Sequence, residues 1–139
     1  MSAVSKSWAL AAPAQAILLV DDDPFLAHAR TAALESFYEE VIRAADAAEA
    51  FILVDQAAFR RELALVVVAL HMPGLSGPAF VAELTSRAPG VPVLVLCRKG
   101  ECTDQYEAEN VHLLPAESSI KEMLSATDEL VRPSEIRIA

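Results

Sequence analysis

The sequence lacks features that define several common classes of protein. Its 139 residues include two cysteines, too few for the disulfide framework of a small secreted domain, and we expect both thiols to be reduced. No apolar run reaches the roughly 18 residues that a membrane-spanning helix needs. The chain has 11 basic residues against 20 acidic ones, and its net charge of −9 disfavours a broad surface for nucleic acid or anionic lipid. These absences favour a cytoplasmic domain that binds neither membrane nor nucleic acid.

The N-terminal segment resembles a secretory signal only faintly. Its apolar core, Trp8–Ala12, is shorter than the roughly 7–15 residues that such a signal requires. Cleavage near Ala16 would also cut directly against the first strand that we expect. We therefore interpret residues 1–14 as a flexible tail, residues 15–132 as one domain of ordinary size, and residues 133–139 as a C-terminal tail.

What the chain does contain is hydrophobic residues, 54% of the total, gathered in short apolar runs. Such runs are typical of strands that are buried on both faces of a sheet. We expect strands at Ala16–Val20, Glu39–Ala45, Leu63–Ala69, Val91–Cys97 and Val111–Pro115. Segments of helical period separate them, and this alternation predicts an α/β fold with a doubly wound parallel sheet of five strands and helices on both faces.

Polar residues with capping spacing mark the starts of the helices. Asp23 can cap the first helix, with a proline at the favourable first position. Asp46 can cap a second segment, which we expect to form a single helix as far as Arg61. Ser119 and Glu122 have the spacing of a capping box before the last, amphipathic helix.

The carboxyl ends of the strands are where we expect a site, because doubly wound sheets bind their ligands at this edge. Asp21, Asp22 and Asp23 follow the first strand. Adjacent carboxylates repel each other unless a cation lies between them, and Mg²⁺ favours one or two carboxylates with water. From these residues alone, a Mg²⁺ site and a helix cap with two solvated carboxylates are equally open.

Two motifs and their surroundings together resemble the receiver domain of response regulators in two-component signalling. They are ILLVDDDP and ALHMPGLSG, followed by an apolar strand and by LP before a capped last helix. The resemblance covers about residues 16–131, nearly the whole chain. It implies a flavodoxin-like sheet with strand order 2-1-3-4-5 and five surrounding helices. It also implies a Mg²⁺-dependent phosphoaspartate at the carboxyl edge of that sheet.

Several positions of the family pattern hold residues that lack the family's chemistry. By resemblance, the acidic metal-binding pair falls on Asp21 and Asp22, and the phosphoacceptor aspartate falls on Ala69. The switch Ser/Thr falls on Cys97, and the family's lysine falls on Leu114. A methyl group offers no nucleophilic oxygen to a phosphoryl group. Neither Cys97 nor Leu114 supplies the hydroxyl and the ammonium that would hold a phosphate oxygen.

These losses together favour a naturally degenerate receiver over an engineered knock-out of the acceptor. The family's switch aromatic falls on Val111, and the interval from Cys97 to Leu114 is shorter than the family usually has. The resemblance therefore implies a shortened fourth helix around residues 103–109. It also leaves a cis Leu114–Pro115 bond open, against the more common trans form.

Without the lysine, the acidic pair needs another counter-ion. Our candidate is Arg98, which would fold over the pocket and lock one conformation without phosphate. The alternative is that Arg98 points into solvent and the carboxylates are hydrated. Weak Mg²⁺ binding at Asp21 and Asp22 stays open, and no other cofactor is expected.

The leading hypothesis for function is a stand-alone pseudo-receiver, a binding module and not an enzyme. It would bind a protein partner without phosphorylation: a histidine kinase, a phosphotransfer protein, another response regulator or a second copy of itself. One alternative is a phospho-switch whose acceptor is Asp21, Asp22 or Asp23. A second is a metal or small-ligand sensor that uses the acidic pocket, and a third is a redox switch at Cys97.

Overall fold

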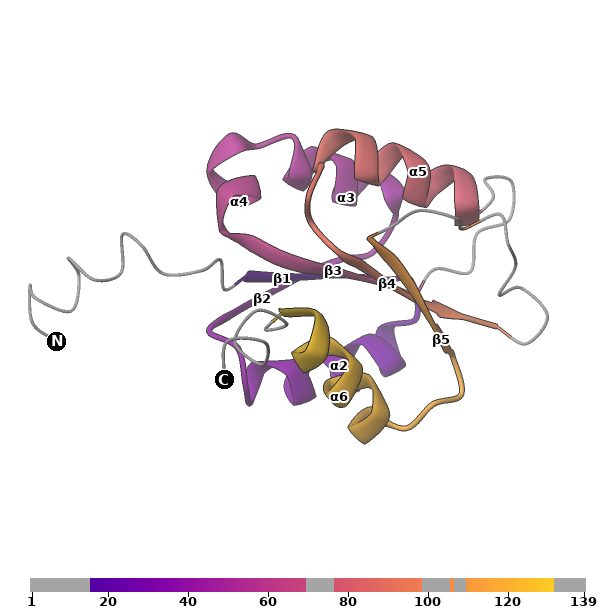
Figure 1. Cartoon of the computed structure of the whole chain (residues 1–139). Coiled ribbons are helices and arrows are strands. Elements are labelled where there is room, and N and C mark those ends of the chain that lie inside the picture. The colour runs from indigo at the N-terminus through magenta and orange to yellow at the C-terminus, as the bar shows by residue number, and fades with distance from the viewer. Residues whose placement is uncertain (1–15, 70–76, 99–105, 107–109, 132–139) are drawn as a thin grey trace, which may run out of the picture.

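The computed structural model describes residues 16–69, 77–98, 106 and 110–131. These residues form a parallel sheet of five strands in the order β2-β1-β3-β4-β5, which confirms the predicted fold class (Figure 1). The strands are β1 (Ala16–Asp21), β2 (Glu40–Ala44), β3 (Leu63–Ala69), β4 (Val93–Cys97) and β5 (Val111–Pro115). The helices are α2 (Pro24–Glu35), α3 (Ala47–Val54), α4 (Ala57–Glu62), α5 (Gly77–Arg87) and α6 (Ile120–Val131).

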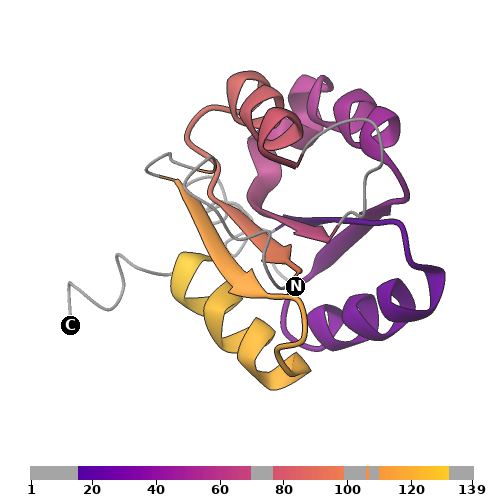
Figure 2. The same cartoon turned by 90° about the vertical axis from the view of Figure 1, so that its right-hand side faces the viewer.

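The sheet separates two layers of helices, and β1 shows why both are needed. Figures 1 and 2 show α3, α4 and α5 over one face and α2 and α6 over the other. Leu18 and Val20 are buried in the core beneath α3 and α5, while Ile17 and Leu19 are buried in the core beneath α2 and α6. Because successive side chains of a strand point to opposite faces, a continuous apolar run requires cover on both.

Two of the predicted helix starts are confirmed by their hydrogen bonds. The carboxylate of Asp23 accepts from the backbone N–H groups of Phe25 and Leu26 at 2.9 and 3.0 Å. The Ser119 hydroxyl accepts from the backbone N–H of Glu122 at 3.1 Å, and the Glu122 carboxylate accepts from the backbone N–H of Ser119 at 2.8 Å. Both ends therefore have side chains that satisfy N–H groups for which a helix has no internal partner.

The single helix predicted from Asp46 to Arg61 is wrong, because the structure has two helices there. Asp46 does cap the first of them, accepting from a backbone N–H at 2.9 Å, but α3 ends at Val54 and α4 begins at Ala57. Nη1 of Arg60 donates to the carbonyl oxygen of Val54 at 2.7 Å. This side chain satisfies a carbonyl at the end of α3, where the helix itself offers no donor.

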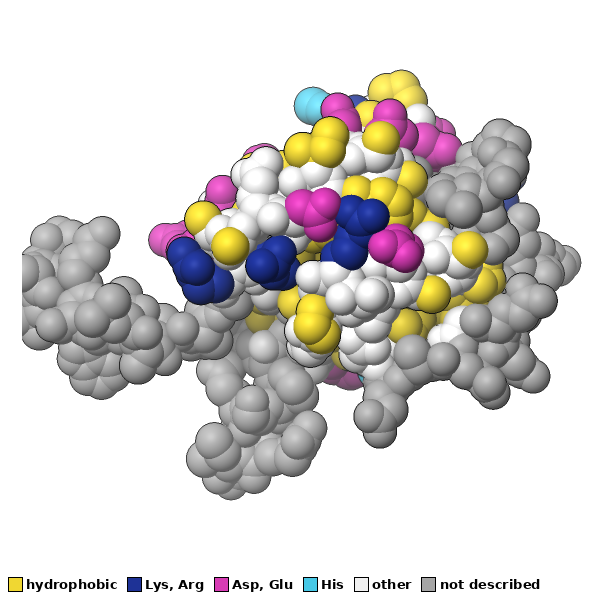
Figure 3. All heavy atoms as spheres, turned by 90° about the horizontal axis from the view of Figure 1, so that it is seen from above, with side chains coloured by type: hydrophobic (Ala, Val, Ile, Leu, Met, Phe, Trp, Pro, Cys, Tyr) yellow, Lys and Arg dark blue, Asp and Glu magenta, His cyan; other side chains and the backbone are white. Residues whose placement is uncertain are grey.

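The outer side of α3, α4 and α5 carries basic and acidic side chains next to one another (Figure 3). Arg87 pairs with Asp55 at 2.7 Å and with Glu83 at 2.9 Å, and its guanidinium lies 4.3 Å from the centre of the Phe51 ring. Exposed ion pairs of this kind contribute at most about 1 kcal/mol each. The pair with Glu83 lies within α5, whereas the contacts of Arg87 with Asp55 and Phe51 join α5 to α3.

Some predictions concern residues that the structure does not describe. The two predicted tails fall outside the described residues, and so does the predicted short fourth helix apart from Tyr106. The described peptide bonds are all trans, including the one between Leu114 and Pro115. Among the described helices, none combines the length and apolar character that a membrane span requires.

Candidate functional site

The carboxyl ends of β1 and β3 bring Asp21 and Ala69 side by side. The two residues are partners in the parallel pairing of these strands. A small pocket of about 110 Å³ lies at this edge of the sheet. Its lining residues are Asp21, Asp22, Asp23, Leu26, Arg30, Ala69, Leu96, Arg98 and Ala116. The acidic residues and the position that the resemblance assigns to the phosphoacceptor therefore do share one pocket.

The carboxylate of Asp21 is fully buried, and hydrogen bonds engage both of its oxygens. Oδ2 accepts from Nη1 of Arg30 at 2.7 Å, and Oδ1 accepts from the backbone N–H of Asp23 at 3.0 Å. The Asp21 side chain has no exposed surface, and the Arg30 side chain is 10% exposed. A buried carboxylate is tolerated only with such compensation, and an arginine donor makes the stronger kind of hydrogen bond.

Arg30 reaches Asp21 because it lies on the inner side of α2. The buried residues of this helix are Ala27, Arg30 and Leu34, spaced three and four apart along one face. Arg30 was not among the site residues predicted from the sequence. The spacing could have indicated a buried arginine with an acidic partner. Arginine at an inward position is almost never buried without a partner, and the acidic triplet lies just before the helix.

A second arginine holds the backbone of Asp21. The Arg43 side chain, on β2, donates from Nε and Nη2 to the carbonyl oxygen of Asp21 at 3.1 and 2.9 Å. Two cationic side chains from different elements thus converge on one residue at the end of β1. Arg30 balances the charge of the Asp21 carboxylate, and Arg43 engages the backbone carbonyl of the same residue.

Arg98, the predicted counter-ion, lines the pocket but is exposed. Within the described part of the chain, the ion pair to Asp21 is made by Arg30, and none is made by Arg98. The physical reason is that α2 already brings a guanidinium within 2.7 Å of the carboxylate. A role of Arg98 in locking one conformation stays a prediction.

Cys97 and Leu114 lie in neighbouring strands at the same edge. Cys97 is 4% exposed, and its Sγ is 3.7 Å from the carbonyl oxygen of Leu114. Cys97 is disulfide-bonded, so the expectation of a reduced thiol at this position is wrong. Cys102 lies outside the described residues. The Leu114 side chain packs against the core beneath α2 and α6 and brings no cation to the pocket.

Comparison with known proteins identifies the family. The family model of the response regulator receiver domain matches residues 17–114. The chain belongs to this family. Receiver domains are generally non-enzymatic signalling modules that interact with histidine kinases and other signalling proteins, and they typically bind Mg²⁺ at the acidic pocket. Among the curated proteins, none matches this chain significantly.

Solved structures share the fold of this receiver domain. The adenylate cyclase from Rhodopirellula baltica has a TM-score of 0.76 at 21% identity, over 90% of this chain and 93% of that one. The receiver domain of the hybrid histidine kinase CckA has a TM-score of 0.69 at 24% identity, over 84% and 99%. The chemotaxis protein CheY4 from Vibrio cholerae has a TM-score of 0.67 at 22% identity, over 86% and 99%. At these identities the likeness shows the fold alone.

The pocket of this receiver domain does not fit the Mg²⁺ that the family typically binds. Arg30 and a backbone N–H engage both oxygens of Asp21, and Ala69 has no ligand atom. Arg30 also puts a positive charge where a divalent cation would be repelled. In the described part of the chain, no group of three or more His, Cys, Asp or Glu residues is arranged to hold a metal.

Proposed function

We propose that this receiver domain is a pseudo-receiver, a module of two-component signalling that binds a protein partner without being phosphorylated. The observation that carries the proposal is the pairing of Ala69 with Asp21, whose carboxylate is ion-paired with Arg30. The methyl group of Ala69 cannot accept a phosphoryl group. The guanidinium of Arg30, and not a metal ion, would neutralise the carboxylate of Asp21. The domain would then have neither the acceptor nor the cofactor for phosphate uptake.

The burial of the ion pair gives the proposal its energetic support. Removing one partner of a buried pair leaves the other charged and uncompensated, which costs about 3–5 kcal/mol. A metal that displaced Arg30 from Asp21 would have to offset a cost of this order, equivalent to a loss of roughly 10²–10⁴ in affinity. The pair would therefore hold the pocket in one state at ordinary Mg²⁺ concentrations.

The proposed partner is a histidine kinase, a phosphotransfer protein, another response regulator or a second copy of the chain. Exposed apolar side chains beside the pocket support a protein partner at this edge of the sheet. Phe25 is 82% exposed and Leu26 is 41% exposed, both in the first turn of α2. Large exposed aromatic side chains are typical anchors of protein interfaces. We propose no enzymatic role, and a cytoplasmic location stays a prediction from the sequence.

One observation favours a second candidate, a phospho-switch with a non-standard acceptor. Asp22 is an exposed carboxylate in the lining of the pocket, whereas Asp21 is buried and Asp23 caps α2. A small-ligand sensor has less support, because about 110 Å³ is below the roughly 300–1,000 Å³ of most ligand clefts.

The proposal is tested by exposing the native chain to acetyl phosphate and Mg²⁺ and measuring its intact mass. We expect no added phosphoryl group, and a receiver domain with an intact acceptor serves as the positive control. Capture of partners from the native cell, with and without the phospho-donor, should yield the same protein in equal amount. A stoichiometric phosphoryl adduct at Asp22 would instead support the phospho-switch.

A further inference from the structure

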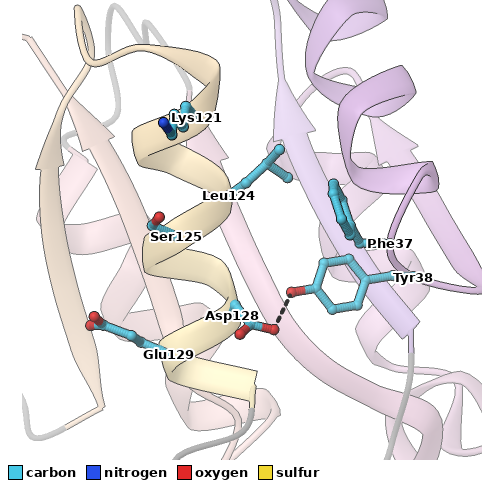
Figure 4. Close-up of a pocket in the computed structure, with 7 residues that line it drawn as sticks. All are labelled: Phe37, Tyr38, Lys121, Leu124, Ser125, Asp128 and Glu129. Atoms are coloured by element: carbon cyan, nitrogen blue, oxygen red, sulfur yellow. Dashed lines mark hydrogen bonds between the residues drawn. The ribbon is translucent and has the colours of Figure 1, made fainter.

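A groove of about 520 Å³ lies between α6 and the turn that joins α2 to β2 (Figure 4). Phe37 and Leu124 point into it from opposite sides, and Tyr38 forms part of its wall. The hydroxyl of Tyr38 donates to Oδ1 of Asp128 at 3.5 Å. Phe37 is 64% exposed, although it is a large aromatic residue at the mouth of a partly apolar groove. A groove of this size with exposed aromatic lining is typical of a binding site.

We propose that residues 1–15, which precede β1 and lie outside the described residues, bind in this groove with Trp8 as the anchor. The groove shares no lining residue with the pocket at Ala69, so this proposal does not rest on the proposed signalling role. The sequence favours a flexible tail for this segment, and a solvated Trp8 would bear that expectation out.

The entry of the chain into the sheet brings this segment close to the groove. Ala16 pairs with Glu40, which is two residues beyond Tyr38. Because β1 and β2 are parallel, Ala16 lies beside the start of β2, close to the turn that contains Phe37 and Tyr38. Figure 1 shows the start of β1, the start of β2 and the end of α6 at the same side of the molecule.

The segment is long enough for Trp8 to reach the groove. Trp8 lies eight residues before Ala16. An extended chain spans about 3.3–3.6 Å per residue, so Trp8 can lie up to roughly 26–29 Å from the start of β1. The groove is lined by Phe37 and Tyr38, which come three and two residues before Glu40, the strand partner of Ala16.

The charge and polarity of the segment are complementary to those of the groove. Lys6 is the sole charged side chain in residues 1–15. The groove is lined by two acidic residues, Asp128 and Glu129, and by one basic residue, Lys121. Trp8 supplies the apolar surface that Phe37 and Leu124 would cover, and Lys6 supplies the positive charge that the acidic rim attracts.

The fluorescence of Trp8 tests this contact directly, because it is the single tryptophan of the chain. In the folded native chain we expect its emission to be blue-shifted, and its quenching by acrylamide to be weaker, relative to the urea-unfolded chain. Phe37→Ser should shift the emission to the red and restore strong quenching. Ile52→Ser is the matched control, since Ile52 is similarly exposed at 62% but lies on α3 at the other face of the sheet. Ile52→Ser should leave the emission wavelength and the acrylamide quenching of Trp8 unchanged.

A second variant keeps the test valid if Phe37→Ser affects folding. Lys6 precedes the described domain, so Lys6→Glu leaves the core intact, and it should produce a red shift in the same direction. Trp8 emission equal to that of the unfolded chain, or unchanged in Phe37→Ser, would overturn the proposal. A blue shift that is lost on dilution would overturn it as well, because it would identify a second copy as the occupant.

Discussion

Nη1 of Arg30 lies 2.7 Å from Oδ2 of Asp21, and the two side chains form a buried ion pair between α2 and the end of β1. The pair joins a helix to the strand edge where receiver domains typically bind their metal. The counter-ion of the Asp21 carboxylate therefore belongs to the chain itself. The balance of charge at Asp21 does not depend on a bound metal ion.

Replacing Arg30 by Met should lower the free energy of unfolding by about 3–5 kcal/mol, because the carboxylate of Asp21 would stay buried without its charged partner. Unfolding in urea measures the change. The double variant Arg30→Met, Asp21→Asn is the control, since it removes both charges and should recover part of the loss. A cost below about 1 kcal/mol for Arg30→Met would mean that the pair behaves like an exposed one.

Restoring an acceptor should not by itself restore the family's chemistry. In Ala69→Asp we expect Mg²⁺ to bind no more tightly than to the native chain, because Arg30 still engages Asp21. The double variant Ala69→Asp, Arg30→Met frees the carboxylate and should gain measurable Mg²⁺ affinity. Calorimetric titration compares the three chains. Tight Mg²⁺ binding by Ala69→Asp alone would show that Arg30 does not block the site.

Gly77, at the start of α5, faces the side chain of Tyr106. A Cβ built at this position would overlap the Tyr106 hydroxyl, which is the far end of a side chain that can shift. Gly77→Ala should therefore destabilise the domain by no more than about 1 kcal/mol, and urea unfolding measures the loss. In Tyr106→Phe, which lacks the hydroxyl, the same substitution should cost less.

Gly90 provides the matched control for Gly77. It has φ +86, where any side chain is strained, and a Cβ built there meets no atom within 4 Å. Gly90→Ala should cost about 1 kcal/mol through its backbone alone, with or without the Tyr106 hydroxyl. An equal cost of Gly77→Ala in both backgrounds would contradict the steric explanation.

The effect of the hydrogen bonds that cap α2 can be measured separately from the effect of the negative charge of Asp23. Asp23→Ala removes the acceptor for two backbone N–H groups and should cost about 1 kcal/mol of stability. Asp23→Asn keeps an oxygen in the same position and should cost much less. Thermal unfolding of the two variants tests this, and equal losses would mean that the negative charge matters more than the hydrogen bonds.

β3 was predictable because most of its residues are buried, and it begins and ends at the predicted residues. β5 also begins and ends at the predicted residues, although its side chains are half-buried or exposed. The break between α3 and α4 was not predictable from the spacing of apolar residues. The carbonyl oxygen of Val54 at the end of α3 is satisfied by the side chain of Arg60, and this spacing does not indicate such a hydrogen bond.

The edge of the site was predicted, but its electrostatics were not. Strand order and register bring Asp21 and Ala69 together as the motifs implied. The counter-ion comes from Arg30, an inward helical residue, rather than from the strand tip where Arg98 lies. The spacing of Arg30 with Ala27 and Leu34 indicates an inward position, but it does not show that this side chain, and not Arg98, reaches Asp21.

The arginine on α2 also constrains the order in which this lineage could change. An aspartate placed at position 69 would meet a guanidinium already in the crevice, and that substitution alone should bring no Mg²⁺ affinity. The arginine would have to be lost first, through an intermediate that carries an unpaired buried acid. A stepwise route from this pocket to a metal site therefore passes through a chain of lower stability.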